Sequence, residues 1–251
     1  MPHLDFNPLL LTMIGGVFML AGFVKGVVGL GLPTITMGLL SVVMPPAHAA
    51  ALLVVPSLVT NLWQIAARPG LAALLRRMAP MLLGVAGGIA AGAGWLTGGA
   101  SSVVITALGA ALLVYAALGL ASVRFHVPPR HERWLSPLVG AATGLVTAAT
   151  GVFVMPAVPY LQSLGLDKEE LVQALGISFL LSTVALAASL GHGGALPTSA
   201  AWASSLALLP ALAGMGLGQR LRRRVPAAAF KRVFFSGLGL LGAYLSLRSW
   251  L

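Results

Sequence analysis

Cysteine is absent from the 251-residue chain, and acidic residues number only five. Without cysteine the chain can form no disulfide, no thiolate metal site and no redox dithiol. Charged residues make up 8% of the sequence, whereas soluble proteins carry roughly a quarter. Hydrophobic residues make up 58%, and the mean hydropathy is +0.97. This composition excludes a soluble domain and predicts a chain that folds within a lipid bilayer.

The few acidic side chains all lie outside the apolar stretches: Asp5, Glu132, Asp167, Glu169 and Glu170. Proton relays and cation sites inside membranes normally use carboxylates, so the sequence argues against a cation pump or cation antiporter. No two histidines have the spacing of metal ligands, and we expect neither a metal nor a cofactor. The net charge of +10 comes from Lys and Arg grouped mostly between apolar stretches, a pattern that encodes membrane topology rather than nucleic-acid binding.

Eight apolar stretches follow one another along the chain: 9–44, 47–67, 78–96, 102–122, 135–164, 171–190, 199–219 and 230–250. One helical crossing needs about 20 apolar residues, so the first and fifth stretches are too long to cross once. Both contain glycine and proline, which interrupt helices, the first at 29–33 and the fifth at 150–156. We predict that each of these two stretches is a broken, re-entrant-like helical hairpin and that the other six each cross once.

The two interrupted stretches occupy matching positions in an internal repeat. A shift of 122 residues lays Gly29 on Gly151, and a shift of 130 residues aligns the later glycines. Duplicated halves of this kind are a common architecture among membrane transporters. We therefore predict one integral membrane domain composed of two repeats, 1–122 and 123–251.

Loop charge predicts that the two repeats are inverted, because basic segments favour the cytoplasmic side. The basic residues gather near 68–77, 123–134 and 220–232: Arg68, Arg76, Arg77, Arg124, Arg130, Arg133, Arg220, Arg222, Arg223, Arg224, Lys231 and Arg232. Their placement makes the first hairpin enter from the outer side and the second from the inner side. The alternative is eight plain crossings with parallel halves, which would put one of the first two basic segments outside.

Lys25 is the only charged residue deep inside an apolar stretch. A charge at membrane depth costs at least about 2.5 to 3.5 kcal/mol, so such a residue usually faces a cavity and marks a pathway. The alternative is that Lys25 reaches to the interface with its long stem. A lysine next to helix restarts, whose free N–H groups and dipole attract negative charge, favours an anion as ligand. We predict that the two helix breaks face each other near mid-membrane and that the anion binds there.

Hydroxyl and amide side chains recur at equivalent places of the two repeats, as where Asn61 aligns with Thr183. The predicted substrate-binding residues are Lys25, Gly29, Gly31, Thr34, Asn61, Gln64, Thr147, Thr150, Gly151 and Ser178. For each hydroxyl the alternative is a bond to its own helix. A second group of glycines has the spacing of close helix packing and is predicted to be structural: Gly84, Gly88, Gly92, Gly214 and Gly218.

Three segments resemble the sulfite exporter TauE/SafE family: AGFVKGVVGLGLP at 21–33, TGLVTAATG at 143–151 followed by Pro156, and QALGIS at 173–178. The resemblance runs through the whole chain in order. The second segment carries Ala149, Val152 and Phe153 where the family commonly has glycine. The resemblance implies a permease of the bacterial inner membrane for small sulfur-containing anions such as sulfite or organosulfonates.

The sequence thus predicts an all-α polytopic membrane protein with two inverted repeats, each a broken hairpin plus three transmembrane helices. It predicts a transporter of small anions rather than an enzyme. The alternatives are an intramembrane hydrolase and an assembly factor whose glycines serve only packing. The expected partners are a small anion and membrane lipid, with a homodimer left open.

Overall fold

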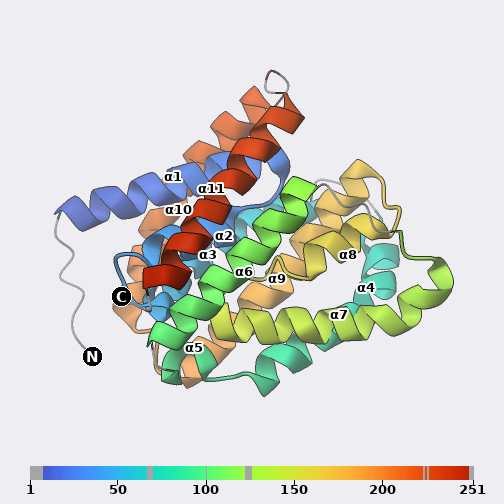
Figure 1. Ribbon diagram of the computed structural model, residues 1–251, viewed down its shortest axis with the longest axis horizontal. Coiled ribbons are helices and arrows are strands. Elements are labelled where there is room, and N and C mark those ends of the chain that lie inside the picture. Colours follow the sequence, from blue (N-terminus) through green and yellow to red (C-terminus); the bar gives the residue numbers. More distant parts are fainter. Residues whose placement is uncertain are drawn as a thin grey trace.

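The computed structural model describes residues 8–66, 70–99, 101–121, 126–222, 224 and 226–248. In this part of the chain the secondary structure is entirely helical, as Figure 1 shows. The helices are α1 (Pro8–Val28), α2 (Leu32–Leu40), α3 (Pro46–Ala66), α4 (Leu71–Ala91), α5 (Trp95–Gly98), α6 (Ser101–Ala121), α7 (Pro129–Thr150), α8 (Ala157–Ser163), α9 (Lys168–His192), α10 (Thr198–Leu221) and α11 (Ala227–Arg248). The predicted all-α class is confirmed.

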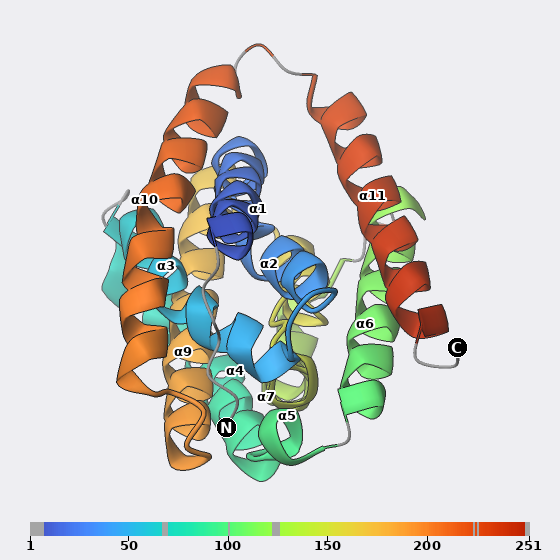
Figure 2. The same ribbon diagram turned by 90° about the vertical axis from the view of Figure 1, so that its left-hand side faces the viewer.

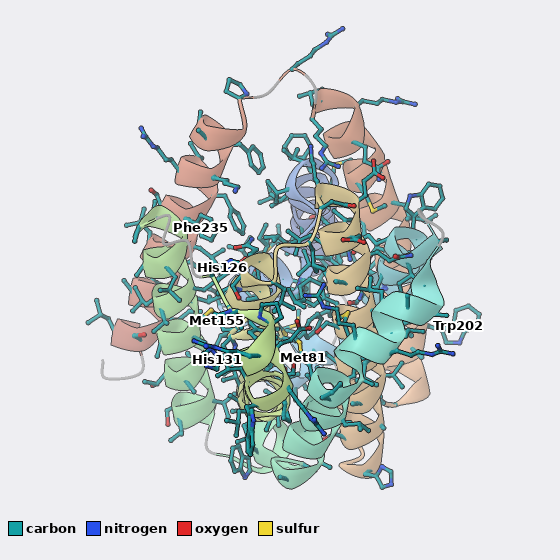
Figure 3. The ribbon with its side chains drawn as sticks, turned by 90° about the vertical axis from the view of Figure 1, so that its right-hand side faces the viewer. Met81, His126, His131, Met155, Trp202 and Phe235 are labelled. Carbon is teal, nitrogen blue, oxygen red and sulfur yellow. The ribbon has the colours of Figure 1, made fainter. Side chains whose placement is uncertain are left out.

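Six helical segments are long and apolar enough to cross a membrane: Pro8–Val28, Pro46–Ala66, Leu71–Gly98, Ser102–Ala121, Lys168–His192 and Ser199–Leu221. Five of them coincide with predicted single crossings. The sixth is α1, the first arm of the first hairpin, and α11 is not among the six. Large apolar side chains also cover the outside, where Trp202 is 71% exposed and projects from α10 (Figure 3). Lipid requires an apolar exterior and helices whose backbone hydrogen bonds are made within the protein. A polytopic membrane protein is therefore confirmed.

Both predicted helix breaks are present. α1 ends at Val28 and α2 begins at Leu32, and the link between them contains Gly29 with φ 82° and Gly31 with φ 114°. α7 ends at Thr150, Gly151 adopts φ 71°, and α8 begins at Ala157. Positive φ is strained for residues with a Cβ, which explains why glycine stands at these positions.

The predicted basic loops are shorter than expected, because several of their residues lie in helices. α4 begins at Leu71 and α7 at Pro129, which places Arg76, Arg77, Arg130 and Arg133 in first or second turns. Arginine is a good helix former, and its long side chain reaches the polar interface from a helix end. Arg68, Arg124 and Arg223 lie outside the described residues.

Glycine allows the closest helix packing in the molecule. α1 runs along α10, and α4 runs along α7. A Cβ at Gly22 would overlap the carbonyl of Ala211, and one at Gly218 would overlap the carbonyl of Phe23. The α4–α7 pair is built the same way, with Gly84, Gly88, Gly140 and Gly144 each against a carbonyl of the facing helix. The structural role predicted for the second group of glycines is confirmed.

The remaining long helices complete the bundle, and the short helix α2 lies among them. α6 pairs with α11, and α3 packs between α9 and α10, so that α11 and α10 stand on opposite sides of the molecule (Figure 2). α2 contacts α1, α3, α6 and α11. It lies in the interior, with every residue buried except Leu39. The first helix break is therefore an internal feature.

Candidate functional site

Lys25 is the buried charged residue around which the candidate site is built. It lies in the last turn of α1 and is 3% exposed. Its ammonium donates to Thr60 Oγ1 at 3.0 Å and to Asn61 Oδ1. Neither partner is charged, and no described carboxylate pairs with Lys25. An ammonium carries three donors, so one N–H of Lys25 has no partner among the described residues.

The acceptors of Lys25 belong to a buried polar face of α3. Ser57, Thr60, Asn61 and Gln64 are all buried, and their spacing of three and four residues places them on one side of the helix. Gln64 Nε2 donates at 2.6 Å to the carbonyl of Gly29 in the first break. α3 therefore holds both the lysine and the break, and the structure brings together Lys25, Gly29, Asn61 and Gln64.

The second break lies against α2, the helix that follows the first break. A Cβ at Gly151 would meet Met37 Cε at 2.7 Å. Thr147 donates to the Thr143 carbonyl at 2.7 Å, and Thr150 donates to the Val146 carbonyl at 2.7 Å. These bonds are the own-helix alternative expected for such hydroxyls. Thr34 likewise donates to the Gly31 carbonyl at 2.9 Å.

Several buried polar atoms near the α3–α9 contact have no hydrogen-bond partner. They include Ser178 Oγ, Ser182 Oγ and Gln64 Oε1, and Ser178 is fully buried. α9 comes close to α3 here, because a Cβ at Gly176 would lie 3.0 Å from Gln64 Cβ. Buried polar atoms without a partner destabilise a fold. The α3–α9 contact therefore contains hydrogen-bonding groups that the described residues leave unused.

A pocket of about 230 Å³ lies farther along α9, lined by Gly70, Ala73, Leu74, Arg77, Leu166, Glu170 and Gln173. Arg77 donates to Glu132 of α7 through two bonds of 2.7 and 2.9 Å and to the Leu164 carbonyl at 3.2 Å. Gln173 donates to the Ile65 carbonyl at 2.9 Å. From the sequence, Arg77 is only a topology signal and Glu132 only an acid outside the apolar stretches. Their contact could not be predicted, because it joins residues 55 positions apart.

Three polar residues of this cluster are not among the predicted substrate-binding residues: Ser57, Thr183, and Thr60, which accepts directly from Lys25. Ser57 accepts from Asn61 Nδ2 at 3.1 Å, and its hydroxyl lies 2.9 Å from that of Thr183 on α9. The helical spacing of Ser57, Asn61 and Gln64 is the signal that would have included Ser57. The described residues contain no group of three His, Cys, Asp or Glu that could hold a metal ion.

These features define a class of protein: a multi-pass helical membrane protein with two interrupted helices and a buried cation beside the first interruption. Buried charge and broken helices at membrane depth are typical of transporters. The family model described as "Sulfite exporter TauE/SafE" matches residues 14–245, and the chain belongs to this family of membrane transporters for sulfur-containing anions. No curated protein and no solved structure matches the chain.

Proposed function

We propose that the protein is a permease that moves a small sulfur-containing anion, sulfite or an organosulfonate, across the bacterial inner membrane, and that the anion binds at Lys25. One observation carries the proposal. Lys25 is 3% exposed, is bonded only to two neutral oxygens, and has no carboxylate partner in the described residues. A buried charge without a counter-ion is costly, and an anionic substrate would supply the counter-ion transiently.

The surroundings of Lys25 favour an anion over a neutral or cationic substrate. The third N–H of the ammonium is available, and charge-assisted hydrogen bonds are stronger than neutral ones. Gly29 and Gly31 allow the backbone to approach a ligand closely, and α2 begins directly after Gly31. The N-terminus of a helix adds partial positive charge. Ser178, whose hydroxyl is unpartnered and buried, supplies one further donor in this proposal.

We propose further that the site lies between two inverted repeats, 1–122 and 123–251. The packing supports this proposal. The first helix of each half packs against a later helix of the other half, α1 against α10 and α7 against α4. The contacts are made by corresponding glycines, since Gly22 and Gly144 are equivalent under the 122-residue shift and both face a carbonyl. The second break, near Gly151, then contributes to the opposite side of the site.

Transport by purified protein in liposomes tests the proposal. Labelled sulfite and a labelled organosulfonate should both be offered, and at least one should enter at a saturable rate. Lys25→Met keeps the apolar stem and removes the charge. We expect its apparent affinity to fall about tenfold to a hundredfold, because one charge-assisted contact is lost. Lys231→Met, at an exposed lysine of α11, is the matched control and should leave the affinity unchanged.

Two outcomes would contradict the proposal. Absence of flux for every sulfur anion offered would favour an assembly factor or an intramembrane hydrolase. A well-inserted Lys25→Met protein with normal affinity would remove Lys25 from the binding site and leave it only as a structural link between α1 and α3.

A further inference from the structure

A chain of hydrogen bonds links Lys25 to α9 through α3. It runs from Lys25 to Asn61, from Asn61 to Ser57, and from Ser57 to Thr183. All four side chains are at most 3% exposed. The last bond joins residues 126 positions apart, so it connects one half of the chain to the other.

The bond that Thr183 makes to its own helix determines which atom is the donor in every bond of this hydrogen-bond chain. Thr183 Oγ1 donates its single proton to the Phe179 carbonyl at 2.6 Å, so toward Ser57 it can only accept. Ser57 must therefore donate to Thr183 across the 2.9 Å contact. With its proton used there, Ser57 Oγ accepts from Asn61 Nδ2 at 3.1 Å.

This direction leaves Asn61 in one orientation. Its NH₂ group faces Ser57, and its Oδ1 is the atom that faces Lys25. A flipped amide would present an N–H donor to an ammonium that is itself only a donor. Thr60 is fixed in the same sense, because its hydroxyl donates to the Pro56 carbonyl at 2.7 Å and must accept from Lys25.

We infer that Ser57 and Thr183 are positioning residues for substrate binding: they hold the Asn61 amide with its oxygen toward Lys25, so that the ammonium points its third N–H at the anion. The inference rests on the proposed function of Lys25. Neither hydroxyl needs to touch the substrate, since each already donates its proton within the hydrogen-bond chain. Their effect on transport passes through Asn61.

The test uses Thr183→Val, which is isosteric and removes the acceptor, and Thr183→Ser, which keeps it. In liposomes loaded for sulfite transport, Thr183→Val should raise the KM about two- to tenfold, the effect of one lost hydrogen bond. The maximal rate should stay near the original value. Thr183→Ser should have the KM of the unsubstituted protein. Ser57→Ala should reproduce the Thr183→Val result, which covers the case in which the valine variant fails to fold.

A double substitution separates positioning from a purely structural role. In an Asn61→Ala background there is no amide to orient, so adding Thr183→Val should not raise the KM further. An additive increase, or an unchanged KM in both Thr183→Val and Ser57→Ala, would overturn the inference while leaving the proposed function intact. No sulfite or sulfonate flux in the unsubstituted protein would overturn the proposed function, and this inference with it.

Discussion

Lys25 and Asn61 form a buried pair in which a charged donor meets a neutral acceptor. Aspartate has nearly the same shape as asparagine but carries a full negative charge. Asn61→Asp would give Lys25 a permanent counter-ion at the distance of a hydrogen bond, where opposite charges attract strongly in a low-dielectric interior. The substrate would then have to compete with this internal carboxylate.

We therefore expect Asn61→Asp to lose affinity for sulfur anions by tenfold or more, although the protein should still insert and fold. The KM for sulfite in liposomes measures the first effect, and membrane expression measures the second. Asn61→Ser removes the amide without adding charge and should be affected less. If the aspartate variant transports with normal KM, then the charge of Lys25 is not what binds the anion.

At the scale of the element, α3 contains Pro56 in its interior, and proline leaves a carbonyl without its usual N–H partner. Ser204 of α10 supplies hydrogen bonds to the backbone at this point. Its hydroxyl donates to the Leu52 carbonyl at 2.8 Å and accepts from the Val55 N–H at 3.0 Å. Without water in the bilayer core, these backbone groups have few other partners. One serine of α10 thus supports the helix that holds Lys25.

Ser204→Ala should lower the stability of the protein by about 1 to 3 kcal/mol, because it leaves buried backbone groups unpaired. Thermal unfolding in detergent measures the change. The neighbouring Ser205 is exposed and bonds to its own helix at Ala201, so Ser205→Ala is the control and should unfold at the original temperature. Equal unfolding temperatures for the two variants would show that Ser204 contributes nothing to α3.

Two glycines on α1 offer a matched comparison at the same scale. Gly22 faces the Ala211 carbonyl so closely that a Cβ would overlap it, whereas Gly16 has nothing within 4 Å of its Cβ position. Gly22→Ala should separate α1 from α10 and destabilise the protein strongly, because the overlap is with backbone that cannot rotate away. Gly16→Ala should be neutral or stabilising, since alanine is the better helix former. Similar stability of the two variants in detergent would contradict the packing described for α1 and α10.

At the scale of the whole molecule, the inverted arrangement is a prediction about which loops face the cytoplasm. The chain has no cysteine, so single cysteines report position directly. Ala72→Cys and Pro128→Cys should react with an impermeant thiol reagent only from the inner side, and Gly194→Cys only from the outer side. Labelling of position 72 or 128 from outside intact cells would contradict the inverted model and favour parallel halves.

Part of the candidate site could be predicted from the sequence. Lys25 was found from the sequence because a charge within an apolar stretch is conspicuous, and Asn61 and Gln64 because buried amides need external partners. Thr147 and Thr150 belong to the same prediction, yet in the structure their hydroxyls bond within α7. Sequence spacing cannot distinguish a hydroxyl that serves a ligand from one that serves its own helix, because both occupy the same helix face.

The sequence by itself determined that the chain folds in a bilayer and that it is helical. It also determined where two helices are interrupted and which glycines allow close helix packing. These follow from composition and from the backbone limits of glycine and proline, which act within a few residues. Only the tertiary structure decided that Asn61 and Thr60 accept from Lys25, that Ser204 serves Leu52, and that Ser57 meets Thr183. Such pairs join residues 35 to 152 positions apart, and their contact depends on how whole helices pack, which no local pattern encodes.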